Sequence, residues 1–150
     1  MSRADDVINV AGHRISGGSL EEAILEHNDL VECAVLGVPD ELKGTVPLGL
    51  LVLKHGVEES EGYSEEKVVN EVIQVVRGRI GPVAAFKLAV VVPKLPKTRS
   101  GKIARSTVVA LAESKPFKIP VTIEDASVYP AIRDALQRIG YAQDAVIPEV

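Results

Sequence analysis

The fold is decided by residues 31–54, VECAVLGVPDELKGTVPLGLLVLK, in which two apolar runs flank a polar turn. Residues 31–38 and 46–54 are rich in β-branched side chains, and a Pro-Asp pair and a His-Gly pair end them. This pattern is typical of strands, and we expect the two strands to be neighbours in one sheet. A third strand is predicted over residues 87–92, which Pro93 closes.

A long amphipathic helix is predicted between the second and third strands. In residues 64–80 the apolar side chains recur at helical spacing, and the charged side chains between them are left for water. The positions expected on the apolar face are Val68, Val69, Val72, Ile73, Val75, Val76 and Ile80.

Three shorter helices are expected elsewhere. Ser19 can cap the first of them, with Glu22 in the capping-box position, and this helix is expected to end near His27-Asn28. The other two are predicted over residues 103–113 and 131–139. The segment between these two is expected to consist of extended pieces, because it is interrupted by Pro116, Pro120 and Pro130.

The N-terminal segment predicts a small hairpin. Residues 7–10 and 13–15 are extended runs around Ala11-Gly12, where the glycine supplies the backbone freedom that a tight reversal requires. The predicted fold class is therefore α+β, with an N-terminal two-stranded hairpin followed by a three-stranded sheet backed by helices.

Composition narrows the class of protein. The chain has 150 residues, of which 46% are hydrophobic, and this is enough for one packed core. Its net charge of -4 disfavours nucleic acid as a general partner. No apolar run reaches the roughly 18 residues of a membrane-spanning helix, and no signal-peptide layout is present, so a soluble domain is expected. The single cysteine fits a reducing compartment, either the cytoplasm or the mitochondrial matrix.

Residues that often bind metals do not form a recognisable pattern in the sequence. His13, His27 and His55 are too scattered to suggest a metal site. Cys33 lies in an apolar strand, where a buried small hydrophobe is a better interpretation than a nucleophile. None of these residues is assigned to chemistry.

A basic segment stands out in this acidic chain. Residues 94–105 contain no acidic side chain, and a solvated surface loop is one interpretation, since runs of like charge are usually just exposed. A phosphate-binding P-loop is excluded, because the positions that would need glycine and serine or threonine hold Pro96 and Ile103. A lysine beside a glycine is nevertheless suited to neutralise developing negative charge. The basic residues are Lys94, Lys97, Arg99, Lys102 and Arg105.

Within this segment, residues 96–103, PKTRSGKI, resemble the C-terminal lysine motif of the adenylate-forming enzymes, in the form typical of acetyl- and propionyl-CoA synthetases. The resemblance implies that Lys102 is the catalytic lysine, which bridges the carboxylate substrate and the α-phosphate of ATP. Such a cation holds together two anions that repel each other and screens the charge that builds up as they react. The resemblance also implies that acetylation of Lys102 would silence it.

The first residues carry a second part of the resemblance. Residues 3–15, RADDVINVAGHRI, are similar to the hinge of this family and to the hairpin after it, although Ser2 stands where the family usually has glycine. The resemblance implies that Arg3 contacts the nucleotide. It also implies that Asp5 is the hinge residue about which the domain swings between adenylation and thioester formation.

Three further residues are assigned to CoA by the same resemblance. Gly12 and Arg14 match the hairpin that faces CoA, and Arg77 matches an arginine near the CoA nucleotide. Taken alone, each position has a simpler explanation. Gly12 could be an ordinary hairpin glycine, and Arg77 could complement the dipole late in its helix.

The implied enzyme is an AMP-forming acid-thiol ligase that acts on acetate or propionate with ATP, CoA and Mg²⁺. The tail over residues 115–125 is similar to that of propionyl-type members. The resemblance implies a large N-terminal AMP-binding domain of the same polypeptide as the partner, since the adenine and acyl pockets belong there. The expected organisation is a hinge at residues 1–6, a lid domain at 7–114, and a tail with a helix at 115–150.

Two other functions remain open from the sequence. A non-catalytic binding module could use the basic segment 94–105 to dock an acidic protein or RNA, although 3% aromatic residues leave little for base stacking. A lid of the same family could also deliver its acyl group to a carrier protein instead of CoA.

Overall fold

The computed structural model describes residues 7–10, 13–42, 44–81 and 86–148. The chain forms two compact units, Met1–Val91 and Val92–Val150. The first unit contains the hairpin, the sheet and two helices, and the second contains the basic segment and two further helices.

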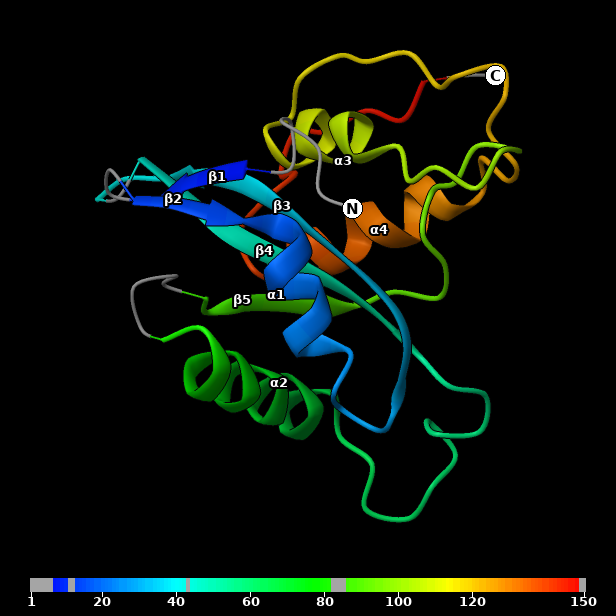
Figure 1. The fold of residues 1–150 in the computed structure, drawn as a ribbon. Coiled ribbons are helices and arrows are strands. Elements are labelled where there is room, and N and C mark those ends of the chain that lie inside the picture. The colour runs from blue at the N-terminus through cyan, green and yellow to red at the C-terminus, as the bar shows by residue number, and fades with distance from the viewer. Residues whose placement is uncertain (1–6, 11–12, 43, 82–85, 149–150) are drawn as a thin grey trace. The chain divides into compact units, whose positions relative to one another are not determined.

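The sheet of the first unit has three strands, as predicted. Strands β3 (Leu30–Asp40) and β4 (Gly44–Leu53) are antiparallel, and β5 (Leu88–Val91) pairs in parallel with β4, so that β4 is central (Figure 1). The parallel pairing of β4 and β5 requires a crossover connection, and the long helix supplies it. The α+β class predicted from the sequence is confirmed.

A close approach in the sheet explains one glycine of the central strand. Gly49 pairs with Val35 on one side and with Ala89 on the other. A Cβ atom at Gly49 would lie 3.0 Å from the ring carbon Cζ of Phe86, which is itself buried. Glycine therefore lets the aromatic ring pack directly on the strand backbone.

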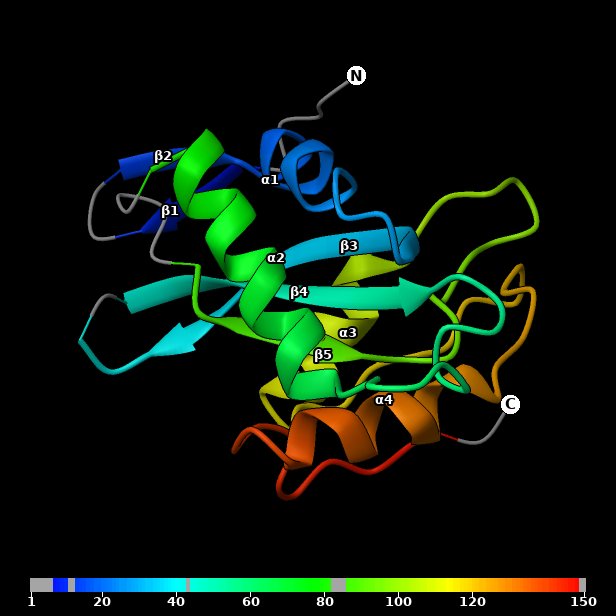
Figure 2. The ribbon, with the colours of Figure 1, turned by 90° about the horizontal axis from the view of Figure 1, so that it is seen from below.

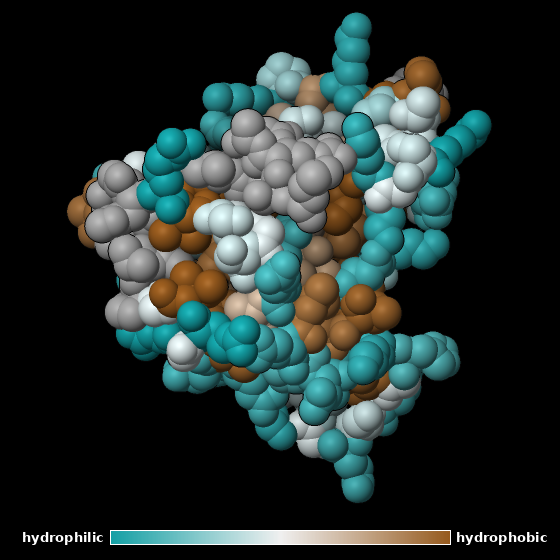
Figure 3. Space-filling model, in the orientation of Figure 1, coloured by the Kyte–Doolittle hydropathy of each residue, from teal (hydrophilic) through white to brown (hydrophobic). Residues whose placement is uncertain are grey.

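Helices α1 (Gly17–Ile24) and α2 (Glu65–Arg79) pack against each other and lie on one face of the sheet, α1 against β3 and α2 against β5 (Figures 1 and 2). Helix α2 begins and ends within one residue of the prediction, and Ser64 caps it. Three valines spaced by one helical turn are buried, while the outer face of α2 is hydrophilic (Figure 3). These are Val68, Val72 and Val76.

The predicted start of α1 is wrong by three residues. The N-cap is Ser16, whose Oγ accepts a hydrogen bond from the backbone N–H of Ser19 at 3.2 Å, so Ser19 is the donor in the first turn and not the cap. The reason is that Ser16 ends the hairpin in extended conformation and already presents its hydroxyl to the next turn. The helix ends at Ile24, and tighter turns continue from there to His27.

The hairpin consists of β1 (Val7–Val10) and β2 (His13–Ser16) and packs against β4. Ile8 and Ile15 are register partners and both are buried, so one face of the hairpin joins the core. The predicted turn at Ala11-Gly12 lies outside the described residues.

In the second unit, α3 (Arg105–Ala112) packs against α4 (Val128–Gln137). Helix α4 begins three residues earlier than predicted and contains Pro130 in its first turn. The expectation that Pro130 belongs to an extended segment before the helix is therefore wrong. Proline fits there because the first N–H groups of a helix have no partner within the helix. Among the described residues, no helix combines the length and apolarity needed to cross a membrane.

Candidate functional site

The segment that carries Lys102 is a hydrogen-bonded hairpin. Lys97 and Ile103 form an antiparallel bridge, and the N–H of Thr98 donates to the carbonyl of Lys102 at 2.8 Å. The N–H of Gly101 donates back to the carbonyl of Thr98, also at 2.8 Å. These two bonds define a three-residue loop over residues 99–101, and Lys102 is the first residue after it.

This loop type explains the glycine beside the lysine. A three-residue hairpin loop needs its last residue in the left-handed conformation, and Gly101 has φ +91°. The Oγ1 of Thr98 adds a bond across the loop, because it accepts from the N–H of Lys102 at 3.3 Å. It also lies 2.9 Å from the hydroxyl oxygen of Ser100. A solvated surface loop is one interpretation of this segment from its sequence, whereas its hydrogen bonds give it a specific conformation.

The tail of the chain pairs with the other edge of this hairpin. Thr98 and Ile123 form an antiparallel bridge, with hydrogen bonds of 2.8 Å on either side of it. The N–H of Arg99 donates to the carbonyl of Thr122, and the N–H of Glu124 donates to the carbonyl of Lys97. No sequence pattern predicts this pairing, since single β-bridges leave no periodicity.

An acidic residue of the tail lies beside the basic segment 94–105, which contains no acidic residue of its own. The carboxylate of Asp125 is 3.7 Å from the ammonium of Lys94. Hydrogen bonds from the side chain and backbone of Ser127, with the nearby Lys94, hold the pKa of Asp125 below its ordinary value. Lys102 is exposed, and over the described ranges no carboxylate pairs with its ammonium.

The other predicted site residues are on the first unit or outside the described part. Arg14 is exposed on β2, opposite Asn9 in the register, and its side chain points away from the face that buries Ile15. Arg77 is exposed in the last turn of α2, where it also complements the helix dipole. Arg3, Asp5 and Gly12 lie outside the described residues.

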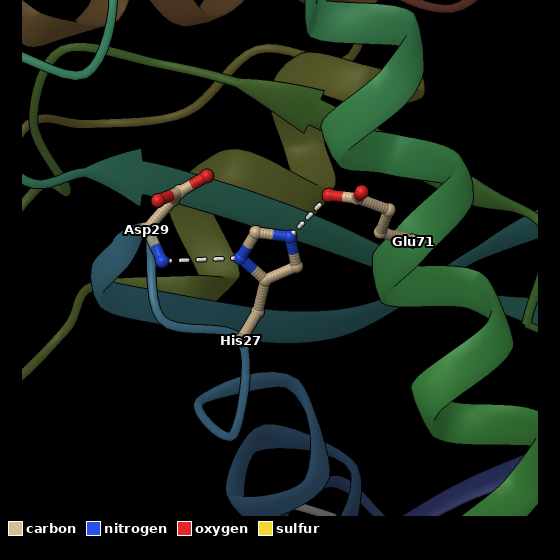
Figure 4. A group of neighbouring side chains, drawn as sticks. All are labelled: His27, Asp29 and Glu71. Atoms are coloured by element: carbon tan, nitrogen blue, oxygen red, sulfur yellow. Dashed lines mark hydrogen bonds and ion pairs between the residues drawn. The ribbon is translucent and has the colours of Figure 1, made fainter.

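One group of potential metal ligands was missed by comparing only the histidines with each other. Side-chain ligand atoms of His27, Asp29 and Glu71 lie within 4.8 Å of one another (Figure 4). Nε2 of His27 is 2.7 Å from a carboxylate oxygen of Glu71 on α2, and Nδ1 accepts from the backbone N–H of Asp29 at 3.1 Å.

These hydrogen bonds define the tautomer of His27. Because Nδ1 accepts a hydrogen bond, Nε2 carries the proton of the neutral ring and donates it to Glu71. A metal at Nε2 would need the opposite tautomer, with Nδ1–H facing the N–H of Asp29. The arrangement therefore fits a hydrogen-bonded link between the loop after α1 and α2 better than a metal site. Cys33 is buried, as the sequence suggested.

The family model of the AMP-binding enzyme C-terminal domain matches residues 19–102. The chain is 56% identical over 138 residues to mouse (Mus musculus) acyl-CoA synthetase short-chain family member 3, mitochondrial, covering 92% of this chain. It is 42% identical over 139 residues to acetyl-coenzyme A synthetase of Pyrobaculum aerophilum, covering 93% of the chain.

A solved structure agrees with these relatives. The acyl-CoA synthetase of Brucella canis aligns with 72% of this chain and 19% of its own, with a TM-score of 0.61 and 34% sequence identity. The chain spans about a fifth of the length of the curated relatives, 20% in both cases above. Since the family model covers more than half of the residues and ends on Lys102, the chain belongs to the AMP-binding enzyme C-terminal domain family, the C-terminal domain of adenylate-forming enzymes.

Proposed function

We propose that this chain is the mobile C-terminal lid of an AMP-forming short-chain acyl-CoA synthetase and that Lys102 is its adenylation lysine. The observation that carries the proposal is the hairpin loop over residues 99–101, which is followed directly by an exposed lysine without an ionic partner among the described residues. An unpaired ammonium on an ordered turn is available to an anionic substrate at little cost of reorganisation.

In the proposed reaction a short-chain carboxylate attacks the α-phosphate of ATP, giving an acyl-adenylate and pyrophosphate. Lys102 offsets the repulsion between the two anions and stabilises the charge that develops as they react. The Mg²⁺ that accompanies ATP is expected on the large AMP-binding domain, and no residue of this chain is assigned to it. CoA then displaces AMP to give the acyl-CoA.

The second half-reaction is assigned to another face of the lid. Rotation about Asp5 would bring the hairpin with Gly12 and Arg14 to CoA, with Arg77 near its nucleotide and Arg3 near the adenylate. The exposure of Arg14 and Arg77 supports this assignment, since both guanidinium groups can reach a phosphate. Lid rotation of this kind gates the chemistry.

The substrate is proposed to be propionate or acetate. The support comes from two relatives, one a short-chain acyl-CoA synthetase and the other an acetyl-coenzyme A synthetase. The relative with the higher identity is mitochondrial by name, which makes the mitochondrial matrix one proposed location and the cytoplasm the other. Acetylation of Lys102 is a proposed means of control, because it removes the charge that adenylation needs.

Separate assays of the two half-reactions test the proposal in the full-length enzyme that carries this chain. Lys102→Ala should lower the rate of adenylation by about 100-fold or more. This rate is measured by the propionate-dependent exchange of pyrophosphate into ATP. The same variant should convert supplied propionyl-adenylate and CoA to propionyl-CoA at close to the original rate. Ordinary adenylation by Lys102→Ala would contradict the proposal, as would acyl-CoA synthesis by this chain alone.

A further inference from the structure

We infer that Thr98 is a positioning residue for Lys102, and that the tail segment 122–124 supports Thr98 from its other side. The inference rests on the proposed role of Lys102 in adenylation. It deepens that role by naming what sets the direction of the lysine, and all of the contacts that carry it lie within the second unit.

Thr98 makes hydrogen bonds to the loop and to the lysine after it through its N–H, its carbonyl and its hydroxyl. Its N–H donates to the carbonyl of Lys102, its carbonyl accepts from the N–H of Gly101, and its Oγ1 accepts from the N–H of Lys102. Both backbone polar groups of Lys102 are therefore bonded to the same residue. The lysine side chain starts from a backbone whose orientation depends directly on Thr98.

The hydroxyl of Thr98 makes two contacts within the hairpin. Oγ1 accepts from the N–H of Lys102 with one of its two lone pairs, and its own proton is available to the hydroxyl of Ser100, 2.9 Å away. A serine at position 98 keeps both bonds, whereas a valine keeps the shape and loses both. The pair of substitutions therefore separates the hydroxyl from the packing of the side chain.

The tail supports Thr98 from the edge that faces away from Lys102. Thr98 lies in the middle of three short paired segments, because residues 102–103 pair with one of its edges and residues 122–124 pair with the other. Ile123 is buried, and its N–H donates to the carbonyl of Pro120, so the tail segment has its own turn. A backbone bonded on both edges loses less conformational entropy when a substrate binds than a free loop does.

The geometry matters for adenylation because a long lysine side chain reaches its target only if its backbone points the right way. Misplacement of a catalytic group by about 1 Å can cost about 100-fold in rate. A lid that still closes but presents Lys102 poorly would bind its substrates and react slowly. The expected signature is a lower kcat of adenylation with little change in KM for ATP.

The test compares Thr98→Val with Thr98→Ser in the full-length enzyme, with Lys102→Ala as the reference. Thr98→Val should lower the kcat of pyrophosphate exchange by about 10-fold or more, and Thr98→Ser should remain within about 3-fold of the original enzyme. Synthesis of propionyl-CoA from supplied propionyl-adenylate should be unchanged in both.

A second pair of substitutions tests the tail. Glu124→Pro removes the N–H that bonds to the carbonyl of Lys97, while Glu124→Ala keeps it.

The outcomes distinguish the positioning role of Thr98 from the proposed role of Lys102 in adenylation. If Lys102→Ala abolishes exchange and Thr98→Val does not reduce it, the positioning inference is overturned while the proposed function stands. Equal losses in Thr98→Val and Thr98→Ser, or equal losses in both half-reactions, would also overturn it. Should Thr98→Val not fold, the decision passes to position 124, where loss of exchange in Glu124→Pro but not in Glu124→Ala supports the inference, and equal exchange in the two contradicts it.

Discussion

The hydroxyl of Tyr129 lies 2.8 Å from the hydroxyl of Thr107, and this bond joins the two helices of the second unit in its interior. Thr107 donates its own proton to the carbonyl of Ala104 at 2.7 Å, so Tyr129 is the donor in the pair. Tyr129 is fully buried, and its ring also contacts Phe117, with ring centroids 5.4 Å apart.

The direction of this bond predicts unequal effects of two substitutions. Tyr129→Phe removes one hydrogen bond but leaves Thr107 bonded to Ala104, so the free energy of unfolding should fall by about 1 kcal/mol. Thr107→Val leaves the buried hydroxyl of Tyr129 without an acceptor and should cost more, about 1–3 kcal/mol. Urea unfolding followed by circular dichroism measures both. A larger loss for Tyr129→Phe than for Thr107→Val would show that the donor has been assigned wrongly.

The same tyrosine predicts a change at alkaline pH. Burial raises the pKa of Tyr129 above its ordinary value, because the charged tyrosinate is disfavoured away from water. Because the folded-state pKa lies above the unfolded one, the stability that neutral Tyr129 contributes is fully present below about pH 10 and is lost as the pH rises through the raised value. Absorbance of tyrosinate should show a titration step above the ordinary range of tyrosine. That late step should be missing in Tyr129→Phe, and its persistence there would contradict the assignment.

The link between His27 and Glu71 predicts a response to zinc. If Nε2 of His27 donates to Glu71, the ring has no free lone pair for a metal, and added Zn²⁺ should not raise the thermal midpoint of unfolding. His27→Ala should lower the free energy of unfolding by about 1–2 kcal/mol, since two hydrogen bonds are lost. Glu71→Gln keeps an acceptor and should cost less. A rise of the midpoint with Zn²⁺ that His27→Ala removes would establish a metal site instead.

A comparison of two glycines tests the loop that carries Lys102. Gly101 has φ +91°, so Gly101→Ala should destabilise by about 1–2 kcal/mol even though no atom stands within 4 Å of the added Cβ. Gly78 lies in α2, also with nothing within 4 Å, and Gly78→Ala should stabilise by about 0.5–1 kcal/mol. Thermal unfolding measures both signs. A stabilising Gly101→Ala would mean that the loop does not need the left-handed conformation.

The sequence predicted the elements that have a strong local pattern. The three strands follow from apolar, β-branched runs, and α2 follows from valines that recur each turn, such as Val68 and Val72. Helix ends were less predictable, because Ser16 and Ser19 are both acceptable caps and only the end of the hairpin decides between them.

Features that depend on distant residues could not be predicted in this way. The pairing of Thr98 with Ile123 and the approach of Glu71 to His27 arise from tertiary structure, and neither leaves a local pattern. The role proposed for Lys102 comes from its motif, whereas its support by the tail has no signal in the sequence. The roles assigned to Lys102, Arg14 and Arg77 stay predictions, as do those of Arg3, Asp5 and Gly12, which lie outside the described part of the chain.

Under the proposed function, Lys102 serves adenylation and the N-terminal hairpin serves thioester formation, so substitutions in the two should affect different half-reactions. Arg14→Ala in the full-length enzyme should raise KM for CoA or lower the rate of thioester formation by about 10-fold, because a charge-assisted bond to a phosphate is lost. Adenylation should be unchanged, which is the opposite of the pattern expected for Lys102→Ala.

Arg79→Ala is the matched control for Arg14→Ala. Arg79 is also an exposed arginine of the first unit, but its guanidinium lies 3.1 Å from Glu26, and it is not assigned to CoA. A surface ion pair of this kind contributes little, so both half-reactions should be unaffected by its loss. If Arg14→Ala slows adenylation and thioester formation equally, the hairpin acts on the fold or the hinge of the lid. In that case the CoA contact has to be sought elsewhere, first at Arg77, whose side chain is exposed on α2.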